Sequence, residues 1–163
     1  LLAVEPNPLA GRLALDSLSA ARSADDIAVD VWFELTCLRG KARLGQGDGM
    51  VADELPGLLG ELGLSAIQVH VSDKASPLVP PYDSEEQRVL VAQYLDWARR
   101  AAGPWDRTES LRYFIAGGGA AADFDAHEDR AARWGRAFPS AVAARSYRAS
   151  GASLMYLVSG RKP

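Results

Sequence analysis

The chain has 163 residues, a length typical of one domain, and its 48% hydrophobic content is enough for a sizeable core. Its net charge of −3 argues against nucleic-acid binding through a general basic surface. The charge is uneven, however: residues 1–98 carry 7 Lys/Arg against 15 Asp/Glu, and residues 99–163 carry 11 against 6. This asymmetry indicates either an anionic ligand or partner on the C-terminal part or, more commonly, two solvated faces.

Cysteine content and apolar runs bear on the compartment. Cys37 is the single cysteine, which excludes an internal disulfide and fits a cytoplasmic setting. No apolar run approaches the ~20 residues that span a bilayer, so no membrane partner is expected. The chain begins without Met or a basic signal segment, directly in strand-like sequence. We therefore expect it to be the later part of a longer protein.

The first predicted element is a strand over Leu1–Asn7, which reads Leu-Leu-Ala-Val-Glu-Pro-Asn. Its first four residues are apolar on both faces, a pattern typical of a strand inside a sheet covered by helices. Pro6 ends the strand, because proline cannot donate to a sheet ladder. Glu5 and Asn7 then lie where open α/β sheets place their ligand crevice.

Helices are predicted over about 9–21, 24–44 and 51–62. Ser23 and Asp26 resemble a capping box at the start of the second helix. Apolar residues at helical spacing predict its buried stripe: Ile27, Val31, Leu35 and Leu38. Cys37 is expected in the core. The glycine-rich segment 45–49 lies between helices, so we interpret it as a turn and not as a phosphate-binding loop.

The second predicted strand, residues 64–72, alternates apolar and polar residues, which favours a position near a sheet edge. A proline-rich loop and helices over about 84–102, 106–116 and 121–138 follow. Pro139 is expected to interrupt the last of these, with a shorter helical piece to about residue 145. The segment 152–160 is apolar on both faces at its middle and predicts a third strand inside the sheet.

This order of motifs resembles the C-terminal half of a class I S-adenosylmethionine-dependent methyltransferase. The resemblance covers nearly all of the chain. The segments that carry it are the three strands Leu1–Asn7, Leu64–Ser72 and Ala152–Gly160, the loop pieces Ser72–Pro77 and Pro80–Tyr82, and Leu111–Phe114 before the glycine triplet. In that family the last strand is inserted antiparallel between the fifth and sixth strands.

The resemblance implies an α/β fold: the C-terminal portion of a three-layer Rossmann-like methyltransferase sheet, with three strands and long helical insertions at about 9–62 and 83–145. The chain would form a single domain over 1–163, the substrate-side part of the enzyme. S-adenosylmethionine is the implied cofactor. The family's glycine-rich turn and ribose-binding acid belong to its first strands and have no counterpart here, so no cofactor-binding residue is expected in this chain.

The implied activity is methyl transfer to a small molecule. Glu5 and Asn7 would then lie on the acceptor side, to hydrogen-bond the substrate or to act as a base, or alternatively would only cap and pair locally. Arg112 and Tyr113 would orient the substrate from a helical lid, or Tyr113 would be core and Arg112 a surface residue. Tyr82 would line a pocket or pack under its loop.

No metal site is expected, because His70 and His127 have no Cys, His or Asp companions at ligand spacing. The sequence leaves a second function open. The chain would then be a non-catalytic α/β ligand-binding or protein-interaction module. Its exposed first strand would be covered by a second copy, by another chain or by a missing N-terminal half.

Overall fold

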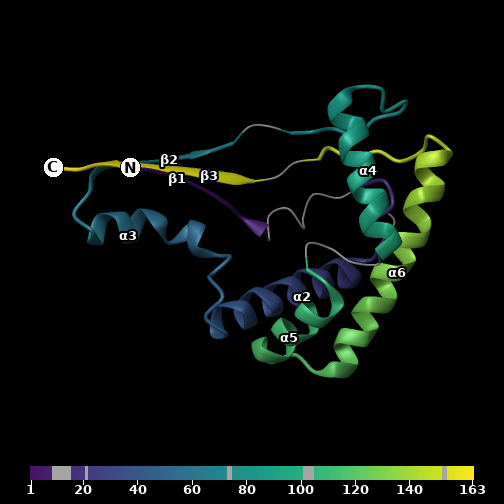
Figure 1. The fold of residues 1–163 in the computed structure, drawn as a ribbon, viewed down its shortest axis with the longest axis horizontal. Coiled ribbons are helices and arrows are strands. Elements are labelled where there is room, and N and C mark those ends of the chain that lie inside the picture. Colours follow the sequence, from purple (N-terminus) through teal and green to yellow (C-terminus); the bar gives the residue numbers. More distant parts are fainter. Residues whose placement is uncertain (9–15, 21, 73–74, 101–104, 152–153) are drawn as a thin grey trace.

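The computed structural model describes residues 1–8, 16–20, 22–72, 75–100, 105–151 and 154–163 (Figure 1). Within them the fold is mixed α/β, with a three-stranded sheet and five α-helices. In chain order the elements are β1 (Leu2–Pro6), α2 (Ala24–Arg43), the 3₁₀ turn η1 (Val51–Asp53), α3 (Leu55–Glu61), β2 (Ser65–Val71), α4 (Glu85–Arg100), α5 (Arg107–Gly117), α6 (Ala121–Ala143) and β3 (Met155–Arg161). Most of the predicted helices and strands are confirmed to within a few residues.

The sheet is organised by β3, which lies between β1 and β2 and is antiparallel to both. Val158 of β3 is fully buried and is paired with Ala3 on one side and Val69 on the other. Because β1 and β2 both run opposite to β3, they run parallel to each other, and their carboxyl ends lie at the same end of the sheet. The predicted inner position of the last strand and the edge position of the second are confirmed.

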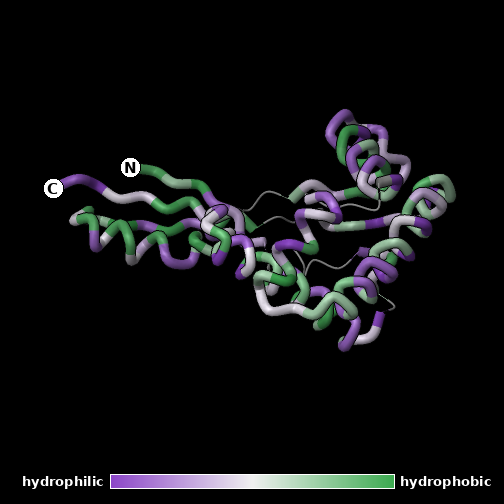
Figure 2. Tube along the Cα trace, turned by 60° about the horizontal axis from the view of Figure 1, so that its bottom comes forward, coloured by the Kyte–Doolittle hydropathy of each residue, from purple (hydrophilic) through white to green (hydrophobic). Residues whose placement is uncertain are grey.

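The prediction for the first strand is wrong in one respect: β1 is not enclosed but lies at a sheet edge. Leu2 and Val4, which share one face of the strand, are 63% and 50% exposed. The reason is that, among the described residues, only β3 pairs with β1. Figure 2 shows this hydrophobic strand at the outside of the molecule, beside the C-terminus.

The helices divide into two groups (Figure 1). The short α3 contacts β2 and β3 and so lies against the sheet. The other four helices, α2, α4, α5 and α6, gather beyond the carboxyl ends of β1 and β2, and we call these four the helical cover. The predicted glycine-rich turn at 45–49 connects α2 to η1.

Two apolar clusters hold the helical cover together. The first joins α2, α5 and α6 through Phe33, Cys37, Tyr113, Phe114 and Phe124, and thereby confirms Cys37 as a core residue. The second joins α4 and α6 to the loops at 78–82 and 147–149. Its buried members are Leu78, Tyr82, Phe138 and Tyr147.

Helix α2 begins as predicted but buries a different face. Ser23 accepts a hydrogen bond from the backbone N–H of Asp26 at 3.1 Å, which confirms the N-cap. In the predicted stripe Leu38 is buried, but the most buried face also includes Thr36 and Gly40. These small residues permit the close approach of α5, and that packing, more than the aliphatic spacing, sets the rotation of α2.

Two further helix predictions, 9–21 and 51–62, differ from the structure. Residues 9–15 of the first predicted helix lie outside the described residues, but 16–20 form a bridge and a turn. The cause is Asp16, whose carboxylate accepts backbone N–H groups from Leu18 at 3.0 Å and Ser19 at 2.7 Å, in competition with helix formation. The predicted helix 51–62 is divided, because Pro56 favours the first turn of a new helix.

Helix α6 continues through Pro139 to Ala143 instead of breaking there. Proline removes one backbone hydrogen bond, but Phe138 on one side of it is fully buried and Ala141 and Val142 on the other side pack against the second cluster. Tertiary packing thus holds the helix beyond a residue that alone would end it.

The crossing of α2 and α5 depends on two glycines. A Cβ at Gly40 would overlap the carbonyl oxygen of Tyr113, and one at Gly117 would overlap that of Thr36. Both neighbours are backbone atoms of packed helices, which cannot move independently.

We therefore expect Gly40→Ala to lower the free energy of unfolding by about 3 kcal/mol, because it overpacks a rigid contact. The measurement is urea unfolding. Gly57→Ala in α3 is the matched control: nothing lies near its Cβ position, and it should be neutral or stabilising by up to about 1 kcal/mol. A Gly40→Ala protein as stable as the parent would contradict the close crossing.

Candidate functional site

The candidate site is the end of the sheet where β1 and β2 finish and the helical cover begins. Just beyond β1, the N–H of Asn7 donates to the carbonyl of Leu154 at 2.9 Å. Just beyond β2, the N–H of Ser72 donates to the carbonyl of Met155 at 2.8 Å. Both segments are therefore held beside the start of β3, and Glu5 and Asn7 are half-buried at this edge.

Tyr82 occupies a core position. Its side chain is 7% exposed, packs with Leu78, Phe138 and Tyr147, and donates its hydroxyl to the carbonyl of Tyr147 at 2.8 Å. This is the second of the two interpretations that the sequence allowed, packing under the proline-rich loop.

Tyr113 and Arg112 lie elsewhere, on α5. Tyr113 is buried in the first cluster and donates its hydroxyl to Oε1 of Gln46 at 2.6 Å. Arg112 is exposed, with its guanidinium 5.3 Å from the centre of the Tyr113 ring. The structure thus brings Glu5 and Asn7 together at the sheet and places Tyr82 and Tyr113 in two separate clusters.

One polar network that the sequence did not reveal is centred on Asp16. Its carboxylate accepts hydrogen bonds from the hydroxyls of Ser19 and Tyr147, the latter at 2.9 Å, and from the indole N–H of Trp134 at 3.4 Å. Burial raises the pKa of Asp16, but these hydrogen bonds outweigh it and hold that pKa below its ordinary value. Burial and the Asp16 carboxylate together raise the pKa of Tyr147.

The Asp16 network connects segments that are distant in the sequence. The N–H of Ser17 donates to the carbonyl of Arg148 at 2.8 Å, and Ala149 exchanges backbone hydrogen bonds with Leu78. The sequence Asp-Ser-Leu-Ser at 16–19 is typical of an Asx turn and was the one local signal for it. Its partners in α6 and beyond are too distant in sequence to have been found.

A second network lies between α2 and α6, centred on Asp30. Its carboxylate is 2.8 Å from Nη1 of Arg22, 3.5 Å from Nδ1 of His127 and 3.7 Å from Nε of Arg130. The His127 ring stacks on Phe33 with 3.5 Å between ring centroids. Burial raises the pKa of Asp30, but the His127 and Arg22 side chains outweigh it and lower that pKa below its ordinary value.

The two glycine-rich segments lie at the ends of helices. Gly45–Gly49 follows α2, and Gly118, with a φ of 103°, caps the C-terminus of α5. Neither follows a strand, so neither forms the strand–turn–helix unit that lets a backbone approach S-adenosylmethionine. These two segments therefore do not fit that cofactor.

Comparison with known proteins adds no family assignment. The chain matches no protein-family model and no curated protein. In the part of the chain that the structure describes, no three His, Cys, Asp or Glu side chains gather as a metal ion would require. Nor is any described helix both long and apolar enough to cross a membrane.

The Asp30 network predicts a pH-dependent contribution to stability. Because its folded pKa lies below the unfolded value near 3.8, its contribution is present above that pH and is lost as the pH falls through the folded pKa. We expect Asp30→Asn to lower the free energy of unfolding by about 1–3 kcal/mol at pH 7, since it removes the anion that pairs with the half-buried guanidinium groups of Arg22 and Arg130. At pH 3 the difference should be smaller.

Denaturant unfolding at the two pH values measures this effect. Asp129→Asn, an exposed change on α6, the helix that carries His127 and Arg130, is the control and should leave stability nearly unchanged. An equal loss at both pH values for Asp30→Asn would contradict an electrostatic role and indicate packing alone.

Proposed function

We propose that this chain is the substrate-side part of an S-adenosylmethionine-dependent methyltransferase that acts on a small molecule. The observation that carries the proposal is the strand order β1-β3-β2, with the last strand antiparallel between the other two. This is the arrangement expected for the final three strands of that Rossmann-like fold. Two long insertions, one before β2 and one before β3, agree with the resemblance.

The directions of the strands support an acceptor site at one end of the sheet. Since β1 and β2 are parallel, the segments that leave them diverge at the same edge, where crevices for ligands form. The helical cover stands at this edge, as a lid over an acceptor would (Figure 1). In the proposal, Glu5 and Asn7 hydrogen-bond the acceptor, and Glu5 removes its proton where the acceptor carries one.

In this proposal the residues of the present chain position the acceptor, and a segment outside this chain holds the cofactor. Methyl transfer is an in-line displacement, so most of what a protein contributes is the alignment of donor and acceptor. The free edge of β1 would then adjoin the strand that precedes it in the complete sheet.

A second candidate function rests on the same exposed strand. Leu1, Leu2 and Val4 are 70%, 63% and 50% exposed, and an apolar edge strand invites pairing with another chain. The chain would then be a non-catalytic interaction module, covered by a second copy or a different protein.

The methyltransferase proposal predicts where cofactor binding resides. Calorimetric titration of S-adenosylmethionine should give no binding with residues 1–163 alone and clear binding with the protein translated from the complete reading frame. In that protein, Glu5→Gln should reduce methyl transfer by about 100-fold, a typical loss for a general base, without weakening cofactor binding. Glu61→Gln, an exposed change on α3, is the control.

Two results would contradict the proposal. One is a complete reading frame without a strand–glycine turn–helix unit upstream of Leu1. The other is absence of cofactor binding by the complete protein, and self-association of residues 1–163 in sedimentation would then favour the interaction module.

A further inference from the structure

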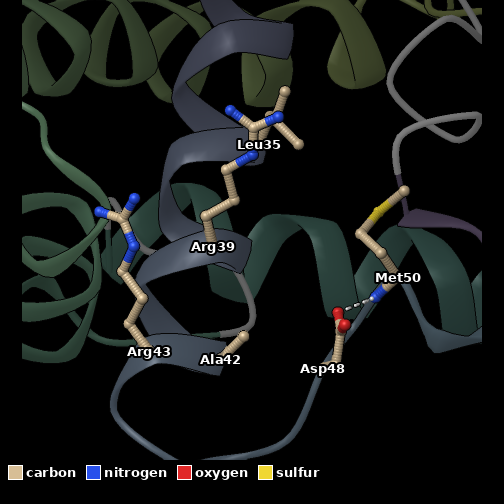
Figure 3. Close-up of a pocket in the computed structure, with 6 residues that line it drawn as sticks. All are labelled: Leu35, Arg39, Ala42, Arg43, Asp48 and Met50. Carbon is tan, nitrogen blue, oxygen red and sulfur yellow. Dashed lines mark hydrogen bonds between the residues drawn. The ribbon is translucent and has the colours of Figure 1, made fainter.

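A pocket lies between the outer face of α2 and the segment that leads to η1 (Figure 3). Its volume is about 430 Å³, within the range of small-molecule sites. Six residues line it: Leu35, Arg39, Ala42, Arg43, Asp48 and Met50. Met50 directly precedes η1, which contacts β1, so the pocket lies on the side of α2 that is nearest the sheet.

The two arginines of the pocket differ in what their guanidinium groups can bind. They are four residues apart on α2 and therefore line the same face. Arg43 is already engaged, because its Nη1 donates to the carbonyl of Ala116 at the end of α5, at 3.0 Å. Arg39 is exposed, and among the described residues its guanidinium makes no hydrogen bond or ion pair. Arg39 is therefore available to an anion, and a guanidinium binds a carboxylate with two parallel hydrogen bonds.

The charges around the pocket limit how much negative charge a ligand can carry. Asp48 adds a negative charge to the wall, where its Oδ1 accepts the N–H of Met50 at 2.8 Å. The pocket also adjoins the last turns of α2, the end at which a helix dipole is negative. Both features oppose a nucleotide or another polyanion.

The remaining walls are apolar. Leu35, Ala42 and the Met50 thioether give the pocket a surface that suits the hydrocarbon part of a ligand, and methionine adapts readily to different shapes. In Figure 3 the Arg39 and Met50 side chains extend from opposite sides of the open space. A cation on one wall and a flexible apolar side chain on the other suit a small amphipathic molecule.

We propose that this pocket binds a small organic monocarboxylate with an apolar body, whose carboxylate pairs with Arg39. Binding by the pocket is independent of the proposed function, but the further statement that this ligand is the methyl acceptor rests on it. The acceptor would then be an aromatic or aliphatic acid, held on the face of α2 near the end of β1.

The test is titration of residues 1–163 with 4-phenylbutyrate and with its neutral isostere 4-phenylbutyramide, followed by NMR chemical shifts. We expect the carboxylate to bind, with shifts at Leu35, Ala42 and Met50, and the amide to bind about tenfold more weakly or not at all, because it forms no charge-assisted pair. Arg39→Gln should weaken carboxylate binding by about tenfold, with Arg39→Lys intermediate, since lysine keeps the charge but not the fork.

Arg136→Gln, an exposed arginine on α6, is the matched control and should leave affinity unchanged. Equal binding of acid and amide, an Arg39→Gln protein with parental affinity, or no shift at millimolar 4-phenylbutyrate would each overturn the proposal. Thermal unfolding of each variant confirms that it is folded. These measurements need no S-adenosylmethionine, so their failure is distinct from failure of the methyltransferase proposal.

Discussion

The pairing of β3 with both β1 and β2 is the constraint on which the rest of the structure depends. It brings together residues 2–6, 65–71 and 155–161, and so closes the chain from its first strand to its last. The backbone N–H of Gly160, which donates to the carbonyl of Leu1 at 3.1 Å, extends the pairing of β3 with β1. Because the two outer strands run parallel, both long insertions must leave or return at the same end of the sheet. The helical cover stands there for that reason.

The helical cover is fixed by two kinds of contact that act over different distances. Glycines at the α2–α5 crossing let backbone meet backbone, and aromatic side chains fill the space around that crossing. Half-buried carboxylates then connect segments of the cover: Asp30 joins α2 to α6, and Asp16 joins the turn at 16–20 to Trp134 and Tyr147. Each carboxylate is held ionised by several donors, which gives the cover a defined orientation above the end of β1.

Sequence reasoning predicted what depends on local pattern. The Ser23 cap, the starts of α2, α4, α5 and α6 to within a residue or so, the existence of three strands and the inner position of the last strand all follow from spacing, capping residues and burial pattern. The predictions were wrong where tertiary contacts determine the local structure. Helix α6 continues through Pro139 because Phe138 is buried, and α2 packs its small residues against α5. For the candidate site, the strand pattern predicted that Glu5 and Asn7 follow the apolar part of the first strand, and their role in binding stays a prediction. The Asp16 and Asp30 networks join residues more than 90 apart in the sequence, which no local pattern reveals.

The most direct test of this account is the strand order itself, since the proposed relation to the methyltransferase fold rests on it. Backbone NMR of residues 1–163 would report it through cross-strand contacts between amide and α protons. The account predicts contacts from Val158 to both Ala3 and Val69, with none between β1 and β2. Contacts between β1 and β2, or a β1 without contacts to β3, would contradict the inserted antiparallel strand and with it the basis of the proposed function.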